Sequence, residues 1–243
     1  RVNWVVTNWF RSQRYYDSGG WRATWKGEGG GVLLNQCPHN LDLLQWICGM
    51  PATVRGFCSL GKRHRIEVED EVTAYLEYAN GATGLFVTAT GEAPGANRLE
   101  ICGDRGRLLV EHGKITFFRT VVSVERFKEE SRAMFAAPDV WTVDVPPARG
   151  GGGQHNEILK NFADAIIDGV PLIAPAEEGI RSVELANAML LSSMTGETIE
   201  LPMDAARYEA HLMDLIRKSA FQKQVREGAK PTDLSTSFNT NPQ

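Results

Sequence analysis

The sequence lacks the features that most often identify a function at once. No hydrophobic run reaches the length of a membrane span. No G-x-G-x-x-G follows a strand, and no G-K-S/T marks a phosphate loop. Of the two glycine runs, Gly29–Gly31 fails because position 34 is Leu34, and Gly150–Gly153 fails because prolines rather than a strand precede it. Neither run is therefore interpreted as a nucleotide site.

Cysteine is also scarce, and neither sign of charge dominates. The four cysteines have neither C-x-x-C nor zinc-like spacing, which favours buried, reduced thiols in a cytosolic protein; they are Cys37, Cys48, Cys58 and Cys102. Lys and Arg number 26 and Asp and Glu 30, for a formal net charge of -4. This balance gives no reason to expect a nucleic-acid partner or an anionic membrane.

What is present is an ordinary globular composition. The chain has 243 residues, 42% hydrophobic and 23% charged, which is enough for a sizeable core. It begins at Arg1, and RVNWVVTNWF has the pattern of a strand from the outset, so we expect a further N-terminal part before it. The aromatic and basic segment 11–28 contains Gly19-Gly20 and is predicted to be a binding loop. Packing of its rings over the sheet edge is the alternative.

Strand patterns fill the middle of the chain, and helix patterns fill its last third. Two-residue alternation at 68–78 and the Asn80-Gly81 turn indicate a mainly antiparallel sheet of six to eight strands. Strands followed by helices favour the α+β class: a large open, mostly antiparallel sheet with helices on one face. We assign residues 1–205 to this domain and residues 206–243 to a C-terminal helix with an extended polar tail. The segments expected as strands include 53–60, 82–90, 98–102, 107–111, 115–119, 121–127 and 141–145, and the helices are 154–168, 176–193 and 204–227.

A helix predicted from about 34 to 48 carries an unusual polar stripe. At about 100° per residue, Asn35, His39 and Asp42 share one side. Short hydrogen-bonding groups of this kind suit a cavity wall better than open water. Pro38 has no N–H for the Leu34 carbonyl, so we expect a kink or local unwinding beside His39. The apolar residues of the opposite side are Leu34, Cys37, Leu41, Leu44 and Cys48.

His39 has two readings at this point. An imidazole beside polar partners can perform acid–base chemistry near neutral pH, whereas a lone histidine on a helix is more often a satisfied core residue. A metal site is disfavoured, because no second His or Glu pair supports the spacing of His39 and Asp42. The acidic run Glu67–Glu71 is interpreted as the start of a strand rather than as paired catalytic carboxylates.

Six motifs occur along the chain in a fixed order: GGGVLLNQCPHNLDLLQWICGMP, VEDEVTAYLEYANGATGLF, LEICGDRGRLLVE, HNEILKNFADAIIDGVP, EEGIRSVELANAML and TIELP. Together they resemble the second domain of the Gfo/Idh/MocA oxidoreductases, the relatives of glucose–fructose oxidoreductase and inositol dehydrogenase. The resemblance covers about residues 1–205. The ordered set is specific, although no single motif would be.

The resemblance implies a fold, a cofactor and a reaction. Such enzymes join an N-terminal Rossmann domain, which holds NAD or NADP, to an α+β domain whose open sheet face often makes the contact of a homodimer or homotetramer. They transfer a hydride between a sugar or cyclitol hydroxyl carbon and the nicotinamide, so a sugar or polyol is the expected substrate. Because no Rossmann domain or Glu-Lys-Pro motif is found in this sequence, we expect the chain alone to bind NAD(P) poorly and not to turn over.

The resemblance also assigns roles to residues. His39 becomes the acid/base or hydroxyl-orienting group, with Asn35 as its catalytic neighbour and Asp42 as a helix anchor. Asn35 stands where the family usually has Asp, and an amide cannot take a proton at neutral pH, although it can donate and accept hydrogen bonds. Residues expected to contact substrate are Tyr16, Arg22, Gln36 and His155, and those expected near the cofactor are Trp21 and Arg22.

Two further interpretations stay open beside this dehydrogenase domain. The first is a non-catalytic module that dimerises through its sheet or binds a sugar. The second, a metal-dependent lyase or isomerase, would need ligands that the sequence does not show.

Overall fold

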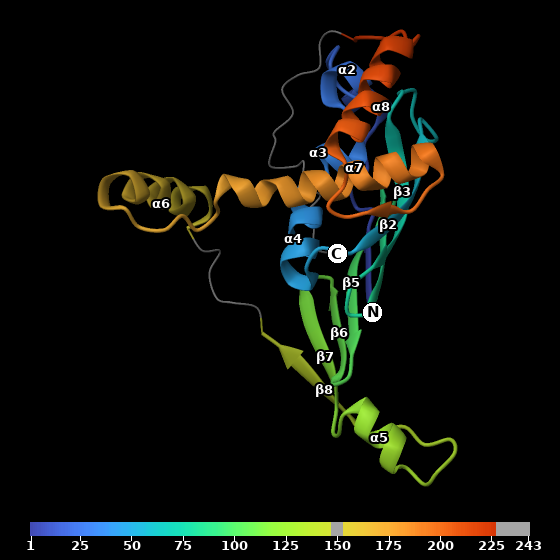
Figure 1. The fold of residues 1–243 in the computed structure, drawn as a ribbon, viewed down its shortest axis with the longest axis vertical. Helices are drawn as coiled ribbons and strands as arrows, with labels where there is room; N and C mark the ends of the chain where they lie inside the picture. The colour runs from blue at the N-terminus through green and yellow to red at the C-terminus, as the bar shows by residue number, and fades with distance from the viewer. Residues whose placement is uncertain (147–152, 227–243) are drawn as a thin grey trace.

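One mixed sheet forms the body of the molecule. The computed structural model describes residues 1–146 and 153–226, in which nine strands lie in the order β8-β7-β6-β5-β1-β4-β3-β2-β9 (Figure 1). Neighbouring strands are antiparallel except for β1 and β4, which run parallel. The strand bounds are Val2–Val6 (β1), Thr53–Leu60 (β2), Glu69–Glu77 (β3), Thr83–Ala89 (β4), Asn97–Gly103 (β5), Gly106–Glu111 (β6), Lys114–Thr120 (β7), Val140–Val145 (β8) and Ile199–Glu200 (β9).

Strand β3 shows how the sequence gives the sheet two different faces. Successive residues from Val72 to Tyr78 alternate between buried and exposed, because side chains of a strand point to opposite faces in turn. Gly81 has φ 82°, a left-handed conformation that suits glycine, in the turn between β3 and β4. The predicted large, mostly antiparallel sheet of the α+β class is confirmed.

Helices are distributed unevenly over this sheet. Helices α4 and α7 pack on each other, and α7 also packs on β2. No helix among the described residues is both long and apolar enough to span a bilayer. The helix bounds are Gln13–Tyr16 (α1), Trp25–Glu28 (α2), Val32–Asn35 (α3), Pro38–Cys48 (α4), Val124–Glu130 (α5), Gln154–Asp168 (α6), Gly179–Thr195 (α7) and Ala205–Lys218 (α8), with a 3-10 turn at Ala176–Glu178.

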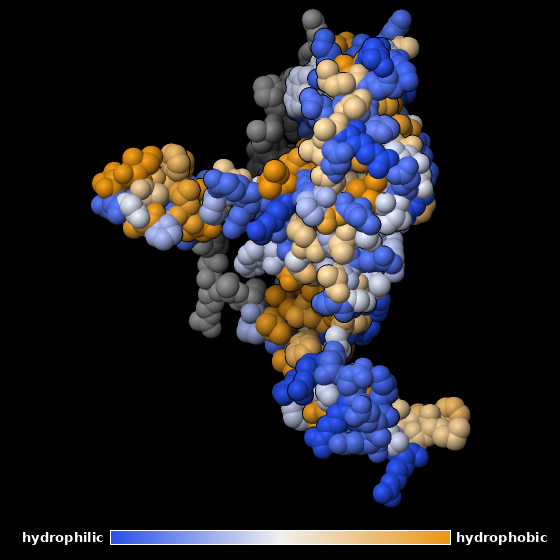
Figure 2. Space-filling view, in the orientation of Figure 1, coloured by the Kyte–Doolittle hydropathy of each residue, from blue (hydrophilic) through white to orange (hydrophobic). Residues whose placement is uncertain are grey.

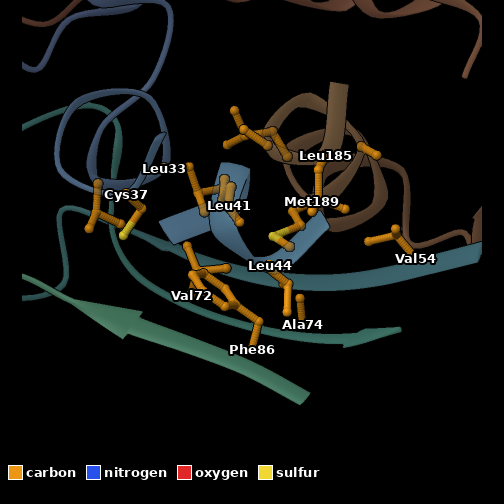
Figure 3. Close-up of a cluster of buried hydrophobic side chains, with 14 of the residues drawn as sticks. Leu33, Cys37, Leu41, Leu44, Val54, Val72, Ala74, Phe86, Leu185 and Met189 are labelled. Carbon is orange, nitrogen blue, oxygen red and sulfur yellow. The ribbon is translucent and has the colours of Figure 1, made fainter. Parts of the chain in front are cut away.

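The core lies between the sheet and helices α4 and α7 (Figure 3). Leu41 and Leu44 of α4 point toward Phe86 of β4 and Met189 of α7, and all four side chains are buried. Burial of one such side chain stabilises the fold by roughly 1.5–3 kcal/mol. Helix α7 approaches β2 closely at Gly56, where an added Cβ would lie 2.3 Å from the Met189 carbonyl oxygen. The core therefore fixes α4, and with it the polar residues next to α4.

Two parts of the described chain extend from this core. Strand β8 and helix α5 lie at the far end of the sheet, and helix α6 extends to the side beyond the start of α7 (Figure 1). Figure 2 shows apolar residues gathered on α6. Its exposed apolar side chains are Ile158, Leu159, Phe162, Ile166 and Ile167.

Three predicted segments differ from the structure. Residues 121–127 are mostly helical, because the Ser123 side chain caps α5 by accepting from the Arg126 N–H at 3.2 Å. The segment 11–28 contains the short helices α1 and α2 rather than loop alone. The last helix, expected over 204–227, ends at Lys218, and residues 219–226 have no regular structure. The polar tail predicted from Ala229 lies outside the described residues.

Candidate functional site

The helix predicted over 34–48 is broken beside its polar residues. Helix α3 ends at Asn35, and α4 begins at Pro38, whose missing N–H is harmless in a first turn. The predicted interruption at Pro38 is confirmed. A single 100° rotation therefore does not relate Asn35 to His39, and the proposed common stripe is wrong. The break instead turns the Asn35 side chain toward α1 and α2.

The Tyr15 hydroxyl is the centre of a hydrogen-bonded cluster at this break. It donates to Asn35 Oδ1 at 2.9 Å and accepts from Arg22 Nη1 at 3.0 Å and from Gln36 Nε2 at 3.1 Å. A phenol has one donor and two lone pairs, so all of its hydrogen-bonding capacity is used. The Tyr15 ring is thereby fixed, and it links α1 to the end of α3.

Asn35 is held on both sides of its carboxamide. Its oxygen also accepts from Gln36 Nε2 at 2.6 Å, and its nitrogen donates to Glu28 Oε1 at the end of α2. Burial raises the pKa of Glu28, although hydrogen bonds from the Ala23 N–H and from Asn35 oppose that shift. One N–H of Asn35 has no partner within the described residues.

Arg22 lies between two aromatic rings. Its Cζ is 4.7 Å from the Tyr15 ring centroid and 4.4 Å from the Trp21 ring centroid, distances that allow cation–π attraction. Trp21 is half exposed. Among the described residues no carboxylate forms an ion pair with Arg22. The structure thus brings Arg22, Gln36 and Asn35 of the predicted site together, with Trp21 at their edge.

The buried carboxylate of Glu69 anchors the start of α3 by hydrogen bonds. Glu69 of β3 is fully buried, and its Oε1 accepts from the Gly31 N–H at 2.8 Å and from the Leu33 N–H at 3.0 Å. Gly31 is required there, because an added Cβ would lie 2.0 Å from the Glu69 carbonyl oxygen. Burial raises the pKa of Glu69 to about 7, although both N–H groups act in the opposite direction. The acidic run is the start of a strand, as predicted, but it also anchors the helix that carries Asn35.

His39 lies in the first turn of α4 with its side chain exposed. Within residues 1–146 and 153–226 it makes no hydrogen bond or ion pair. It is therefore not the satisfied core histidine that was the alternative reading. Asp42, one turn later, accepts from Gln45 Nε2 at 2.9 Å within the same helix. The catalytic role of His39 stays a prediction.

Two predicted substrate residues lie elsewhere, and this corrects our sequence reading. The Tyr16 side chain is buried, and its hydroxyl lies 2.7 Å from Thr90 Oγ1. Burial raises the pKa of Tyr16 well above its usual range. Tyr15 takes the position expected of Tyr16, since adjacent residues of the short helix α1 point in different directions. His155 is exposed on α6, which extends away from the Tyr15 cluster (Figure 1).

The unstructured residues 219–226 reach the same region, which the sequence did not indicate. The Arg226 N–H donates to the Asp17 carbonyl oxygen at 2.9 Å, and the Ser219 hydroxyl donates to the Glu67 carboxylate. A pocket of about 420 Å³ opens between Phe221, Asp17 and the His64–Ile66 turn. The sequence did not identify Tyr15, Glu28 or Lys223 as residues of the site. Of the three, only Tyr15 had an indication in the sequence, because it is an aromatic residue of the predicted binding loop.

His64, which lines this pocket, is hydrogen-bonded to the buried carboxylate of Asp70. His64 Nδ1 lies 3.0 Å from Asp70 Oδ2, and His64 Nε2 lies 2.8 Å from the Arg11 carbonyl oxygen. Asp70 also accepts from the backbone N–H groups of Lys62 and Arg63. Burial alone would raise the pKa of Asp70, but these hydrogen bonds outweigh it and the pKa lies below its usual value. Both ring nitrogens of His64 have partners, so His64 offers no nitrogen to a ligand.

Comparison with known proteins connects this arrangement to a family. Residues 1–109 match the family described as GFO/IDH/MocA C-terminal domain. The WlbA dehydrogenase from Bordetella pertussis, solved with NADH and UDP-GlcNAcA, is similar with a TM-score of 0.62 and 26% identity, over 84% of this chain and 54% of that one. A levoglucosan dehydrogenase, solved with NADH and levoglucosan, shares the fold at a TM-score of 0.61 and 18% identity, over 84% and 58%.

A curated relative adds to this comparison. The uncharacterized protein y4oX of Sinorhizobium fredii is 22% identical over 208 residues, which are 83% of this chain and 55% of that protein. This chain thus spans about half the length of the proteins that it matches. The resemblance indicated by the six motifs is confirmed.

Proposed function

We propose that this chain, which carries a GFO/IDH/MocA C-terminal domain over residues 1–109, is the substrate side of an NAD(P)-dependent dehydrogenase for a sugar or cyclitol hydroxyl. One observation carries the proposal. The Tyr15 cluster fixes the polar groups of Arg22, Asn35 and Gln36 at the break before α4, and the exposed imidazole of His39, without a partner in the described chain, follows in the first turn of α4. Similar structures solved with NADH and with UDP-GlcNAcA or levoglucosan support this reading.

The nicotinamide cofactor, NAD or NADP, would supply hydride transfer when bound. The described residues offer no glycine-rich turn between a strand and a helix for its pyrophosphate, so a separate dinucleotide-binding domain would hold most of it. On this chain, the half-exposed Trp21 ring backed by Arg22 is the surface that fits one edge of a planar cofactor. The fit is therefore partial, and the cofactor role of Trp21 and Arg22 is a proposal.

The residues of this chain would bind the substrate and move its proton. The free N–H of Asn35 would donate to a substrate oxygen, and its carbonyl side is occupied by Tyr15 and Gln36. His39 would accept the hydroxyl proton as the hydroxyl carbon loses its hydride, since a neutral imidazole is a base near pH 7. Asn35 itself does not titrate, so in this mechanism it orients the hydroxyl and His39 carries the proton.

The test uses the complete protein, in which we expect this chain to be joined to a dinucleotide-binding domain. His39→Ala is expected to lower kcat about 100-fold or more on the best substrate of a sugar and cyclitol screen, with cofactor KM changed less than about threefold. His211→Ala on α8 is the matched control and should retain activity. Equal turnover of wild-type and His39→Ala protein would remove the catalytic assignment.

A second candidate, a module that acts by pairing its sheet, rests on a different observation. The sheet face opposite the core exposes Phe57, Tyr75 and Leu85 on neighbouring strands, with Tyr75 paired to Leu85. An exposed apolar patch on a strand face is typical of a subunit contact. We propose a homodimer or homotetramer through this face. This assembly is compatible with the dehydrogenase, and it would be the sole function if no substrate were found.

A further inference from the structure

Residues 219–226 carry a buried amine along Asp17 and Glu67. The Lys223 Nζ atom is buried from solvent and has no hydrogen-bond partner among the described residues. The segment on either side is fixed: Ser219 donates to Glu67, and Arg226 Nε lies 3.2 Å from Asp17 Oδ2. Lys223 therefore does not lie at a free end, and its amine is directed inward between two anchors.

The segment that carries Lys223 lies against the segment that carries Arg22, because an added Cβ at Gly20 would lie 3.9 Å from the Val225 side chain. Burial lowers the pKa of Lys223, the nearby carboxylates of Asp17 and Glu28 oppose the shift, and the positive charge of Arg22 adds to it. Likewise, burial raises the pKa of Glu28, and the positive charges of Arg22 and Lys223 both act to lower it. Two cations from distant parts of the sequence thus share one environment, although neither forms an ion pair within the described chain.

The carboxylates nearby already have donors of their own. Glu28 accepts from the Ala23 N–H and from Asn35, and Glu67 accepts from the Trp25 N–H at 3.1 Å and from Ser219. Asp17 accepts from Gln13 Nε2 at 2.9 Å and is ion-paired with Arg226, although its buried Oδ2 makes no hydrogen bond within the described residues. Burying an ammonium group without a partner costs free energy. Pairing that group with a bound anion would therefore be favourable.

We propose that Arg22 and Lys223 form a cationic subsite that binds the carboxylate of an acidic sugar, beside the hydroxyl-orienting Asn35. This inference rests on the proposed function and narrows it to a substrate class. The planar fork of Arg22, with its ring-stacked faces and free N–H groups, matches the planar carboxylate, and Lys223 supplies a second charge. Gln36, which is buried and has an unpartnered Oε1 within the described residues, can accept a sugar hydroxyl next to it.

The subsite is tested by calorimetric titration of the 243-residue chain with D-glucuronate, D-glucose and inorganic phosphate at constant ionic strength. We expect saturable binding of glucuronate, at least tenfold tighter than that of glucose and of phosphate. Lys223→Met and Arg22→Met should each weaken glucuronate binding about tenfold or more, whereas Lys223→Arg, which keeps the charge, should stay within about threefold. Lys26→Met, at an exposed position of α2, is the matched control and should bind as the wild type does.

Several results would overturn the subsite. They are no saturable glucuronate binding to the wild-type chain, equal affinities for glucuronate and glucose, tighter binding of phosphate, or unchanged affinity in Lys223→Met. Different results would overturn the proposed dehydrogenase function. Reduction of NAD(P)+ by the complete protein with neutral sugars alone would keep the dehydrogenase and overturn the subsite. Glucuronate binding that depends on Lys223, without reduction by any sugar, would keep the subsite and overturn the dehydrogenase.

Discussion

The side-chain nitrogen of Asn35 donates to the Glu28 carboxylate, so the amide at this position is matched to an acid on the neighbouring helix. An aspartate at position 35 would place two carboxylates in contact, and one of them would have to take up a proton. This pairing gives a physical reason for an amide where the family usually has an acid. It also shows that Asn35 has a structural role besides the one we propose with substrate.

Asn35→Asp is expected to destabilise the chain at pH 7. It removes one donor and adds a like charge, so the free energy of unfolding should fall by roughly 1–3 kcal/mol. The loss should shrink near pH 4.5, where the two carboxyl groups can share a proton. Urea unfolding followed by circular dichroism at both pH values measures the effect.

A second substitution makes the Asn35→Asp experiment specific. In the double variant Asn35→Asp with Glu28→Gln, the new amide can donate to the new carboxylate, and stability at pH 7 should recover by more than half. Equal stability of Asn35→Asp and the wild type at pH 7 would show that the contact between Asn35 and Glu28 does not matter for folding.

Glu69 predicts a pH dependence of stability. Its pKa in the folded chain is raised by burial to about 7, above an ordinary value of 4.5, so the folded state binds more protons between these values. The free energy of unfolding should therefore decrease as pH rises from about 4.5 to about 7. Glu69→Gln keeps an acceptor for Gly31 and Leu33 but cannot ionise, so its curve should lack this decrease.

Urea unfolding across pH 4 to 8 compares the two proteins. The stability difference between Glu69→Gln and the wild type should grow in favour of the variant by roughly 1–3 kcal/mol across the window. Glu77→Gln, at the other end of β3, serves as control and should give a curve parallel to the wild type. Parallel curves for Glu69→Gln as well would mean that Glu69 does not titrate in this range.

The open sheet face predicts an oligomer that one substitution disrupts. Tyr75 lies on this face between Arg55 of β2 and Leu85 of β4, and its side chain is exposed. Light scattering at micromolar concentration should give at least twice the chain mass of 26.9 kDa for the wild type. Tyr75→Arg should give the single-chain mass, because a desolvated guanidinium without a partner opposes association.

Controls separate disrupted assembly from misfolding. Tyr75→Phe should keep the wild-type mass, and Tyr75→Arg should keep the wild-type circular dichroism spectrum. A wild-type protein that is monomeric at this concentration would remove the sheet-face contact from the proposal.

Local patterns predicted those parts of the structure that depend on near neighbours in sequence. The alternation from Val72 to Tyr78 predicted the two different faces of β3, and Pro38 predicted the helix break. The stripe with Asn35 and His39 failed because it assumed an unbroken helix. Residues 121–127 were predicted as a strand, whereas Ser123 caps a helix there.

The site itself depends on contacts that no local pattern contains. Tyr15 reaches Asn35 across 20 positions of sequence, and Glu69 reaches Gly31 across 38. The sequence gives no signal for such pairs, because only the folded sheet brings α1, α3 and β3 together. Lys223 was missed for a related reason, since its segment lost the helix expected there and lies along Asp17 and Glu67 instead.

The position of β1 has a consequence for how the chain acquires its site. Val2 pairs with Gly84 on one side and with Ile101 on the other, so the first strand in the sequence pairs with two strands that lie much later in the sequence. Pairing between strands that are far apart in sequence is slow, because the entropy of a long loop must be lost before the strand contacts form. Tyr15 and Arg22 follow soon after β1, so the strand that joins the two halves of the sheet also places the first residues of the site.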